Sequence, residues 1–485
     1  MSAQVAGGSG RSDKPHMLII MTDQQRADCL SCAGHPQIRT PHLDRIAREG
    51  TRFAQAVTVA PLCMPARISF ATALYPHDHG VWGNAGSLAE SDATLFQALQ
   101  REGYSTALVG KAHYYEQHRG MDLREREAYM RERGFEHVHE VPGPFGSGLT
   151  TSYLSDEWQR KGVWDQVRED LASRAAAGDW VVRPSPLAVD DHLDSYVGRR
   201  AVEFVDAYRD ERPMCLFVGF PGPHEPWDAP GSYATMYAPE ETPPPIPVPP
   251  FNGKLSSRVR RKAAFEAFSA QQLALIPQIR ANYYGKISLI DEHVGRLLAA
   301  LERRGMLDDS IVVFLADHGE MLGDHGRIRK GTFHESGVRI PLLMRWPGRI
   351  EAGAVSDALV ESIDILPTLR EAAGCTPAAR CAGRSLWPLL QSHGNDALRE
   401  AQLSEVEHHR ENQTMLRTRK HKLALDGVSR TFMLYDLERD PLEQHNLAGD
   451  PDASDLESRL RQLLRSRIER SSFPAARAIS ATRAG

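Results

Sequence analysis

Five short apolar runs, each the length of a β-strand, constrain the fold of this chain more than any other feature of its sequence. Several runs are almost continuously hydrophobic, as in strands that are buried on both faces. Helical patterns lie between them, over 92–102 with Asp92 as the N-cap and over 283–304, which ends at Gly305. Strands that alternate with helices predict an α/β fold in which helices sandwich a mostly parallel sheet. The five runs are 17–21 (MLIIM), 106–109 (TALV), 215–218 (CLFV), 311–315 (IVVFL) and 340–344 (IPLLM).

The C-terminal part of the chain has a different pattern. After a change in periodicity around 386–397 come two strand-like segments, 414–424 and 430–435, and then a helical pattern over 452–469. This order predicts a smaller α+β subdomain packed on the main one. The predicted organisation is a flexible leader over 1–16, a main α/β domain over 17–395 and the C-terminal subdomain over 396–485.

Composition excludes several classes of protein. Among the 485 residues, 58 are Lys or Arg and 63 are Asp or Glu, and the net charge of −5 disfavours a general nucleic-acid binder. The chain has no apolar run near the roughly 20 residues that span a bilayer, and its Gly/Ser-rich start lacks the apolar centre of a signal peptide. We therefore expect a cytoplasmic protein with no membrane partner. The six cysteines are sparse, and Cys29 and Cys32 have no second pair at zinc spacing.

Residues with catalytic or metal-binding chemistry follow four of the predicted strands. In chain order they are Asp23 and Gln24, Lys111 and His113, His224, and Asp317 and His318. Ligands bind beyond the carboxyl ends of the strands in open α/β sheets, so we expect these side chains to meet. The first and last pairs offer three oxygen ligands and one nitrogen, which suits a hard cation such as Ca²⁺, Mg²⁺ or Mn²⁺. The alternative is two unrelated strand–helix turns.

The segment 61–75 (PLCMPARISFATALY) contains a C-x-P-x-R motif. Pro65 fits the first turn of a helix, which would place Cys63 at the helix N-terminus, where backbone N–H groups favour an anion. Arg67 could reach a buried oxygen from the same side. Taken by itself, Cys63 is either a nucleophilic thiol of low pKa or a buried cysteine before a helix.

The C-x-P-x-R motif is the signature of the sulfatase family, which lies within the alkaline-phosphatase-like superfamily, and the chain resembles that family well beyond this motif. The similar segments occur in family order from residue 17 to about residue 450. The resemblance therefore covers most of the chain and implies an alkaline-phosphatase-like α/β fold. The segments are 19–28 (IIMTDQQRAD), 40–50 (TPHLDRIAREG), 75–84 (YPHDHGVWGN), 109–113 (VGKAH), 224–227 (HEPW), 317–324 (DHGEMLGD) and 434–447 (LYDLERDPLEQHNL).

The resemblance implies two cofactors and a set of site residues. A formylglycine-generating enzyme would oxidise Cys63 to formylglycine, whose hydrate would be the nucleophile. One divalent ion would bind beside it, with Ca²⁺ expected and Mn²⁺ or Mg²⁺ as alternatives. The implied metal ligands are Asp23, Gln24, Asp317, His318 and the modified Cys63. The implied catalytic residues are Cys63, Arg67, Lys111, His113, His224 and Lys330, with Asn84 as a substrate contact.

The activity that the resemblance implies is hydrolysis of a small sulfate ester at the S–O bond, as in an arylsulfatase, with release of the alcohol and inorganic sulfate. Promiscuity towards phosphate and phosphonate esters is expected, because the transition states share charge and shape. We expect no nucleic-acid partner and leave a homo-oligomer open. The segments 140–195 and 240–275 are expected to form the rim of the substrate pocket.

Two residue pairs depart from the commonest sulfatase pattern, which has two adjacent acids after the first strand and an Asp-Asn pair at the later site. Here the pairs are Asp23-Gln24 and Asp317-His318, which resemble those of phosphonate monoester and phosphodiester hydrolases and of some bacterial sulfatases. The missing acid predicts less negative charge at the metal. The K-A-H sequence at 111–113 resembles the Lys-x-His of sulfatases and favours a sulfatase over a phosphonate hydrolase.

Two further classes of function are less favoured. A non-catalytic, sulfatase-like binding protein would be expected to lack one of the catalytic residues, and all of them are present. A two-metal phosphatase needs a second cluster of Asp and His ligands in the space that Lys111 and Lys330 would fill with positive charge. His334 and Glu335 are expected either to line the substrate pocket or to lie on the surface, and Tyr283 is expected in the core.

Overall fold

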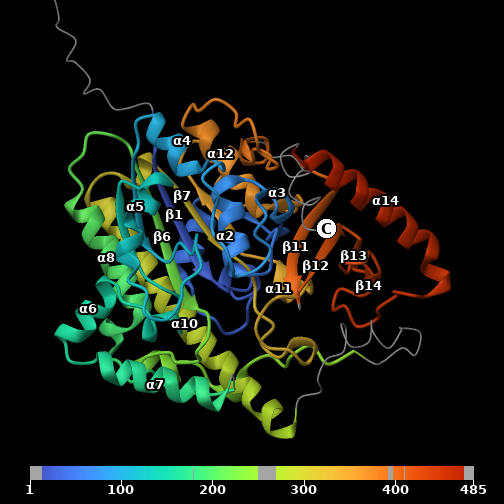
Figure 1. Ribbon diagram of the computed structural model, residues 1–485, viewed down its shortest axis with the longest axis horizontal. Helices are drawn as coiled ribbons and strands as arrows, with labels where there is room; N and C mark the ends of the chain where they lie inside the picture. The colour runs from blue at the N-terminus through green and yellow to red at the C-terminus, as the bar shows by residue number, and fades with distance from the viewer. Residues whose placement is uncertain (1–13, 179, 250–268, 392–396, 409, 474–485) are drawn as a thin grey trace, which may run out of the picture.

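The computed structural model describes residues 14–178, 180–249, 269–391, 397–408 and 410–473 (Figure 1). Most of the predicted leader, residues 1–13, and the predicted boundary between residues 395 and 396 lie outside the described residues. Across the part of the chain that is described, no helix has both the length and the apolar character needed to cross a bilayer.

A mostly parallel sheet forms the centre of the molecule and confirms the predicted fold class. Within the described residues its strands are β1 (His16–Asp23), β2 (Thr51–Phe53), β4 (Ser105–Gly110), β5 (His137–Glu140), β6 (Met214–Pro223), β7 (Ser310–Ala316), β8 (Leu342–Arg345) and β9 (Ala354–Ser356). Their order is β5-β4-β6-β1-β7-β8-β2-β9. Strand β8 runs antiparallel to β7 and β2, and the other neighbouring pairs are parallel. Two short strands, β3 (Ala56–Val57) and β10 (Val360–Glu361), pair beside this sheet.

Helices cover both faces of the sheet, because alternate residues of its buried strands point to opposite sides. The described helices are α1 (Pro41–Arg48), α2 (Cys63–Thr72), α3 (Pro76–His79), α4 (Leu95–Arg101), α5 (Glu127–Glu132), α6 (Tyr153–Arg160), α7 (Trp164–Ala177), α8 (Leu193–Ala207), α10 (Ala270–Arg303), α11 (Glu335–Val338), α12 (Ile365–Ala372) and α13 (Trp387–Gln391). In β1, Leu18 and Ile20 belong to an apolar cluster with residues of α8 and α10. Met17 and Ile19 belong to the cluster on the other face, with residues of α2, α4 and α12.

The C-terminal part is an antiparallel sheet with one long helix beside it, seen at the right of Figure 1. Its elements are β11 (Ala401–His408), β12 (Glu411–Thr418), β13 (His421–Leu425), β14 (Thr431–Asp436) and α14 (Ser454–Ser471). Leu403, Leu416 and Leu464 lie in the same apolar cluster as Met17 of the central sheet. The two sheets therefore share one continuous core.

Some predicted element boundaries are wrong for local reasons. Thr94, rather than Asp92, caps α4, because its side chain accepts a hydrogen bond from the Gln97 N–H. Helix α10 begins at Ala270 rather than at residue 283, since a capping box starts it earlier and it accommodates Pro277. Strand β8 begins at Leu342, after a proline that has no N–H to donate to a neighbouring strand.

Candidate active site

The carboxyl ends of four neighbouring strands carry the candidate catalytic residues. Strands β4, β6, β1 and β7 lie next to one another and run parallel, so they end at the same edge of the sheet. Asp23 is the last residue of β1, and Asp317 directly follows β7. Lys111 directly follows β4, and His224 directly follows β6. Side chains that are far apart in the sequence thus meet at one edge, as expected for an α/β sheet.

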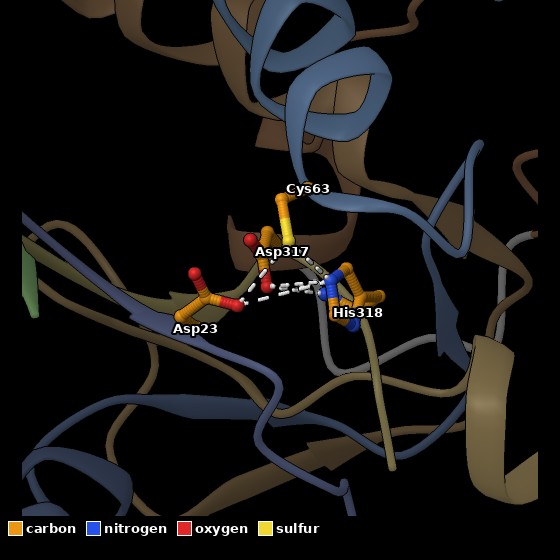
Figure 2. A group of neighbouring side chains, drawn as sticks. All are labelled: Asp23, Cys63, Asp317 and His318. Carbon is orange, nitrogen blue, oxygen red and sulfur yellow. Dashed lines mark hydrogen bonds and ion pairs between the residues drawn. The ribbon is translucent and has the colours of Figure 1, made fainter. Parts of the chain in front are cut away.

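Asp23, Cys63, Asp317 and His318 form a buried group that we call the catalytic cluster (Figure 2). Their candidate ligand atoms all lie within 4.8 Å of one another. The Cys63 Sγ lies 3.2 Å from His318 Nε2 and 3.6 Å from Asp23 Oδ1. His318 Nδ1 lies 3.0 Å from the carbonyl oxygen of Gly319. A proton on Nδ1 would be donated there, which leaves the Nε2 lone pair facing the cluster.

Cys63 is the first residue of α2, as the C-x-P-x-R motif predicted. Leu62, at the N-cap position, is extended and its side chain cannot cap the helix. The first turn of α2 therefore presents backbone N–H groups that favour an anion. One of them, the Met64 N–H, donates to Asn84 Oδ1 at 3.0 Å. Asn84 thus contacts the start of the nucleophile helix, and its side chain is exposed.

Three cationic side chains surround the catalytic cluster. Lys111 Nζ forms an ion pair with Asp23, and Lys330 Nζ donates to Gln24 Oε1. Arg67 Nη1 donates to the Lys111 carbonyl oxygen at 2.7 Å. Arg67 Nη2 is buried 3.6 Å from Asp23 Oδ2, and it has no hydrogen-bond partner among the residues that the structure describes. This donor is available to an anionic ligand, which is what a sulfate-binding site requires.

The charges of the site favour metal-binding protonation states. Burial opposes ionisation of Asp23, but the cations around it, Lys111 foremost, hold its pKa well below the usual range. Arg67 Nε donates to Asp317 Oδ2 at 2.8 Å. Burial lowers the pKa of His318, which keeps its imidazole neutral near pH 7. Ionised carboxylates and a neutral imidazole are the forms that bind metal ions.

The donor set fits a hard divalent cation. Asp23, Asp317, His318 and the amide oxygen of Gln24 would hold the ion. Oxygen ligands with one imidazole suit Ca²⁺, Mn²⁺ or Mg²⁺, whereas a thiol prefers softer metals. An oxygen at position 63, as in formylglycine, matches this set better than the sulfur of an unmodified Cys63.

Two buried carboxylates beside Gln24 were not identified from the sequence. Gln24 Nε2 donates to Glu225 Oε2 at 2.6 Å and also to Glu320 Oε2. The Gln24 N–H donates to Asp317 Oδ1 at 2.9 Å, with the Gln24 backbone in the left-handed region at a φ of 70°. The signal in the sequence is their spacing, because Glu225 directly follows His224 and Glu320 is the acid of the D-H-G-E segment.

The two histidines near the cluster differ in their surroundings. Burial and the charge of Lys111 hold the pKa of His113 well below the usual range, so this imidazole is neutral at pH 7. Its Nδ1 is buried without a hydrogen-bond partner among the described residues. His224 Nδ1 lies 2.6 Å from the Glu225 carbonyl oxygen. The second nitrogen, Nε2, is then the one available to a ligand.

The hydroxyl of Tyr283 supports the loop after β1. Tyr283 is buried, as predicted for a core residue. Its hydroxyl donates to the Gln24 carbonyl oxygen at 2.6 Å and accepts from the Arg26 N–H at 2.9 Å. The aromatic ring therefore packs in the core while its polar end fixes the backbone that carries Asp23 and Gln24.

A pocket of about 730 Å³ has one face of α7 as a wall and comes nearest to the site at Arg329. An added Cβ at Gly143 would lie 3.2 Å from Lys111 Nζ, and Phe145, two residues further on, lines the pocket. Arg329 also lines it, and its Nε lies 3.0 Å from Glu225 Oε1. The lining over 145–178 falls in the segment expected to form the pocket rim, whereas residues 250–268 of the other expected segment lie outside the described residues.

A second group of potential metal ligands, His325, His334 and Glu443, lies between the two sheets and is called here the interface cluster. Glu443 Oε1 accepts from Lys422 Nζ at 2.6 Å, and Glu443 Oε2 accepts from the Glu335 N–H at 2.8 Å. The ammonium group therefore already neutralises the carboxylate. The prediction of a surface position for His334 is wrong, because this side chain is buried against the C-terminal sheet. It is not among the residues that line the pocket beside α7.

Comparisons with known proteins agree with this geometry. The family model described as Sulfatase matches residues 15–375, and the model described as N-sulphoglucosamine sulphohydrolase, C-terminal, matches residues 323–470. An arylsulfatase of Clostridium perfringens is 30% identical over 464 residues, which cover 94% of this chain and 95% of the relative. A multifunctional alkaline phosphatase superfamily protein, PehA of Trinickia caryophylli, is 30% identical, with 90% and 92% covered. The structure of a phosphonate monoester hydrolase from Silicibacter pomeroyi superposes with a TM-score of 0.76 at 25% identity, over 94% of this chain and 96% of that one.

Proposed function

The chain belongs to the sulfatase family of hydrolases, and we propose that it cleaves the S–O bond of a small sulfate ester with a formylglycine derived from Cys63. One observation carries this proposal. Cys63 begins α2 and points into a group of buried metal-ligating side chains, within a ring of three cations. A buried cysteine with a purely structural role has no need of such surroundings.

Positive charge around the substrate supports the reaction. The oxygens of a sulfate ester repel nucleophiles, so catalysis requires that their charge be neutralised. Lys111, Lys330 and Arg67, whose Nη2 makes no hydrogen bond within the described residues, would bind these oxygens. A divalent ion held by Asp23, Gln24, Asp317 and His318 would supply further positive charge to the sulfate and the nucleophile. We propose Ca²⁺ as this ion.

The aldehyde hydrate at position 63 explains how the sulfate is released. One hydroxyl of the hydrate would attack sulfur as the bond from sulfur to the alcohol oxygen breaks, and the proton that this hydroxyl loses would balance the one that the leaving alcohol gains. The second hydroxyl then loses its proton, the bond from carbon to the sulfated oxygen breaks, and inorganic sulfate leaves. Addition of water to the aldehyde restores the hydrate. An unmodified thiol or hydroxyl lacks this second step.

The two histidines are suited to move the protons. We assign His224 as the acid that protonates the leaving alcohol, because its Nδ1 contacts a carbonyl oxygen and its Nε2 remains available. His113 is neutral at pH 7 and can accept the proton from the second hydroxyl. The leaving alcohol would lie in the pocket beside α7, whose lining includes Arg329, the neighbour of Lys330.

The first experiment is mass spectrometry of the tryptic peptide 53–67 (FAQAVTVAPLCMPAR), with protein made in a host that has a formylglycine-generating enzyme. We expect a fraction of the peptide to carry an aldehyde in place of the Cys63 thiol. The same preparation, loaded with metal, should release sulfate from an aryl sulfate. A peptide that is wholly thiol would overturn the proposed nucleophile.

A phosphonate monoester hydrolase is the alternative function. The presence of both Gln24 and His318 among the candidate metal ligands favours the phosphonate hydrolase, as does the similarity to the Silicibacter pomeroyi enzyme. Lys111, which forms an ion pair with Asp23, favours the sulfatase. The ratio of kcat/KM for an aryl sulfate and an aryl phosphonate monoester decides between them, and a large preference for the phosphonate would favour the alternative.

A further inference from the structure

Two buried carboxylates meet on the side-chain amide of Gln24. Glu225 is 4% exposed and Glu320 is fully buried. Each carboxylate uses its Oε2 to accept a hydrogen bond from Gln24 Nε2. The other oxygen of each is held by the surrounding loop: Glu225 Oε1 lies 3.0 Å from Arg329 Nε, and Glu320 Oε1 accepts from the Leu322 N–H at 3.0 Å. The carboxylates are therefore fixed acceptors, and Gln24 is the residue that they hold.

This arrangement determines which way the amide points. A glutamine side chain can present either its oxygen or its nitrogen, because the two are nearly the same in shape, and only its partners select one orientation. Both N–H groups of Gln24 are directed at the carboxylates, so Oε1 faces the opposite side, where it accepts from Lys330 Nζ. The reversed amide would place its oxygen against two carboxylates and its N–H groups against an ammonium.

We propose that Glu225 and Glu320 are positioning residues, which orient Gln24 so that its amide oxygen rather than its nitrogen is available to the metal ion. The inference rests on the proposed metal site. The side that Oε1 faces is the side of the catalytic cluster, because Lys330 interacts electrostatically with Cys63, Asp23 and Asp317.

The same contacts revise the expectation of weaker negative charge at the metal. Position 24 carries no charge, but the side chains of Glu225 and Glu320 lie one hydrogen bond behind it. Negative charge is then carried by Glu225, which holds the ligand, rather than by the ligand itself. A carboxylate at position 24 would instead face both Glu225 and Glu320, with strong mutual repulsion.

The test is a charge exchange between positions 24 and 320. The variants are E225Q/E320Q, Q24E and Q24E/E320Q in the full-length chain, and E405Q is the control, because Glu405 is also buried but lies in β11 and contacts His77. Binding of Ca²⁺ and of Mn²⁺ to metal-depleted protein is measured by titration calorimetry, and thermal unfolding shows that each variant is folded. We expect E225Q/E320Q to weaken metal binding by about 10–100-fold, the usual effect of losing groups that orient a ligand.

The double variant Q24E/E320Q shows whether the contact between positions 24 and 320 is what supports metal binding. Q24E alone should weaken binding, and Q24E/E320Q should restore much of it, since the hydrogen bond between the two positions is then re-formed with donor and acceptor reversed. E405Q should bind as the unaltered protein does. Native affinity in E225Q/E320Q, or a double variant no better than Q24E, would overturn the inference. Absence of metal binding by the unaltered protein would instead contradict the proposed function, so the two failures are distinguishable.

Discussion

The catalytic cluster and the interface cluster contain similar side chains, but they lie at different places in the fold. Both are buried groups of carboxylates and histidines beside lysine and arginine side chains. In the interface cluster both oxygens of Glu443 receive protein donors, and the rings of His325 and His334 stack at 4.0 Å. The catalytic cluster instead lies where β1 and β7 end and α2 begins.

The difference shows how a site for a ligand is distinguished from a structural contact. Lys422 donates to Glu443 and to the Phe333 carbonyl oxygen, so its charge is used to hold the C-terminal sheet on the central one. Lys330 contacts the amide of Gln24 and interacts electrostatically with the whole catalytic cluster. Residue type alone does not separate the two clusters. Their positions do, because the catalytic cluster lies at the carboxyl ends of parallel strands, where α/β proteins bind ligands, whereas the interface cluster lies between the two sheets.

The largest expected effect is the loss of activity in C63A. Removal of the nucleophile should lower kcat/KM for an aryl sulfate by on the order of 10⁴-fold or more, as for other residues that act as the nucleophile of a catalytic unit. Thermal unfolding should change little. The control is C375A, a partly buried cysteine outside both clusters, which should retain native activity. Substantial turnover by C63A would place the nucleophile elsewhere.

A matched pair of lysine variants tests the contrast between the clusters directly. K330M should lower kcat/KM by about 10²–10³-fold, because it removes a group that stabilises charge in the transition state. K422M should lower the free energy of unfolding by about 3–5 kcal/mol, the usual cost of breaking a buried ion pair. Steady-state kinetics and chemical denaturation of both variants are needed. If the folded fraction of K422M also loses kcat, the interface cluster takes part in catalysis and the contrast fails.

A smaller effect is expected from filling the pocket beside α7. A172W places a bulky side chain among the lining residues, whereas S173W places the same side chain on an exposed position of α7 that does not line the pocket. We expect A172W to lower kcat/KM by about tenfold for a bulky aryl sulfate and by less for a compact alkyl sulfate. S173W should leave both values unchanged. Equal effects of the two variants would show that the leaving group binds elsewhere.

The smallest expected effect is on the acid stability of the interface cluster. Burial opposes ionisation of Glu443, but Lys422 lowers its pKa from 4.5 to about 2. A folded-state pKa below the unfolded value contributes stability above pH 4.5, and this contribution is lost as the pH falls from 4.5 towards 2. Melting temperatures between pH 6 and pH 3 should therefore fall less steeply in E443Q than in the unaltered protein. If the melting temperatures of the two proteins fall equally with pH, Glu443 does not contribute to the acid sensitivity.

Local sequence patterns predicted the strands and the nucleophile helix well. Continuous apolar runs identified β1, β4, β6 and β7, because a strand buried on both faces has no polar positions to interrupt it. The C-x-P-x-R motif placed Cys63 at the start of α2 for an equally local reason, the fit of Pro65 to a first turn. The early start of α10 was missed because a proline within its pattern reads as a break.

Contacts across long sequence separations were not predictable in the same way. The sequence does not show that Glu225 and Glu320 both contact Gln24, since neither lies near it in the chain. His334 was misjudged because its surroundings come from the C-terminal sheet, about 100 residues further along the chain. The apolar pattern of β8 likewise does not show that this strand pairs antiparallel with β7.

By itself, the sequence of this protein determined which residue types follow each strand, and so the chemistry that the sheet edge can carry. It also determined the family, because its motifs recur in order along most of the chain. Only the tertiary structure decided which buried charges pair with one another and which side chains meet in the catalytic cluster. The physical reason is that pairing depends on distances of a few ångströms between segments that only folding brings together.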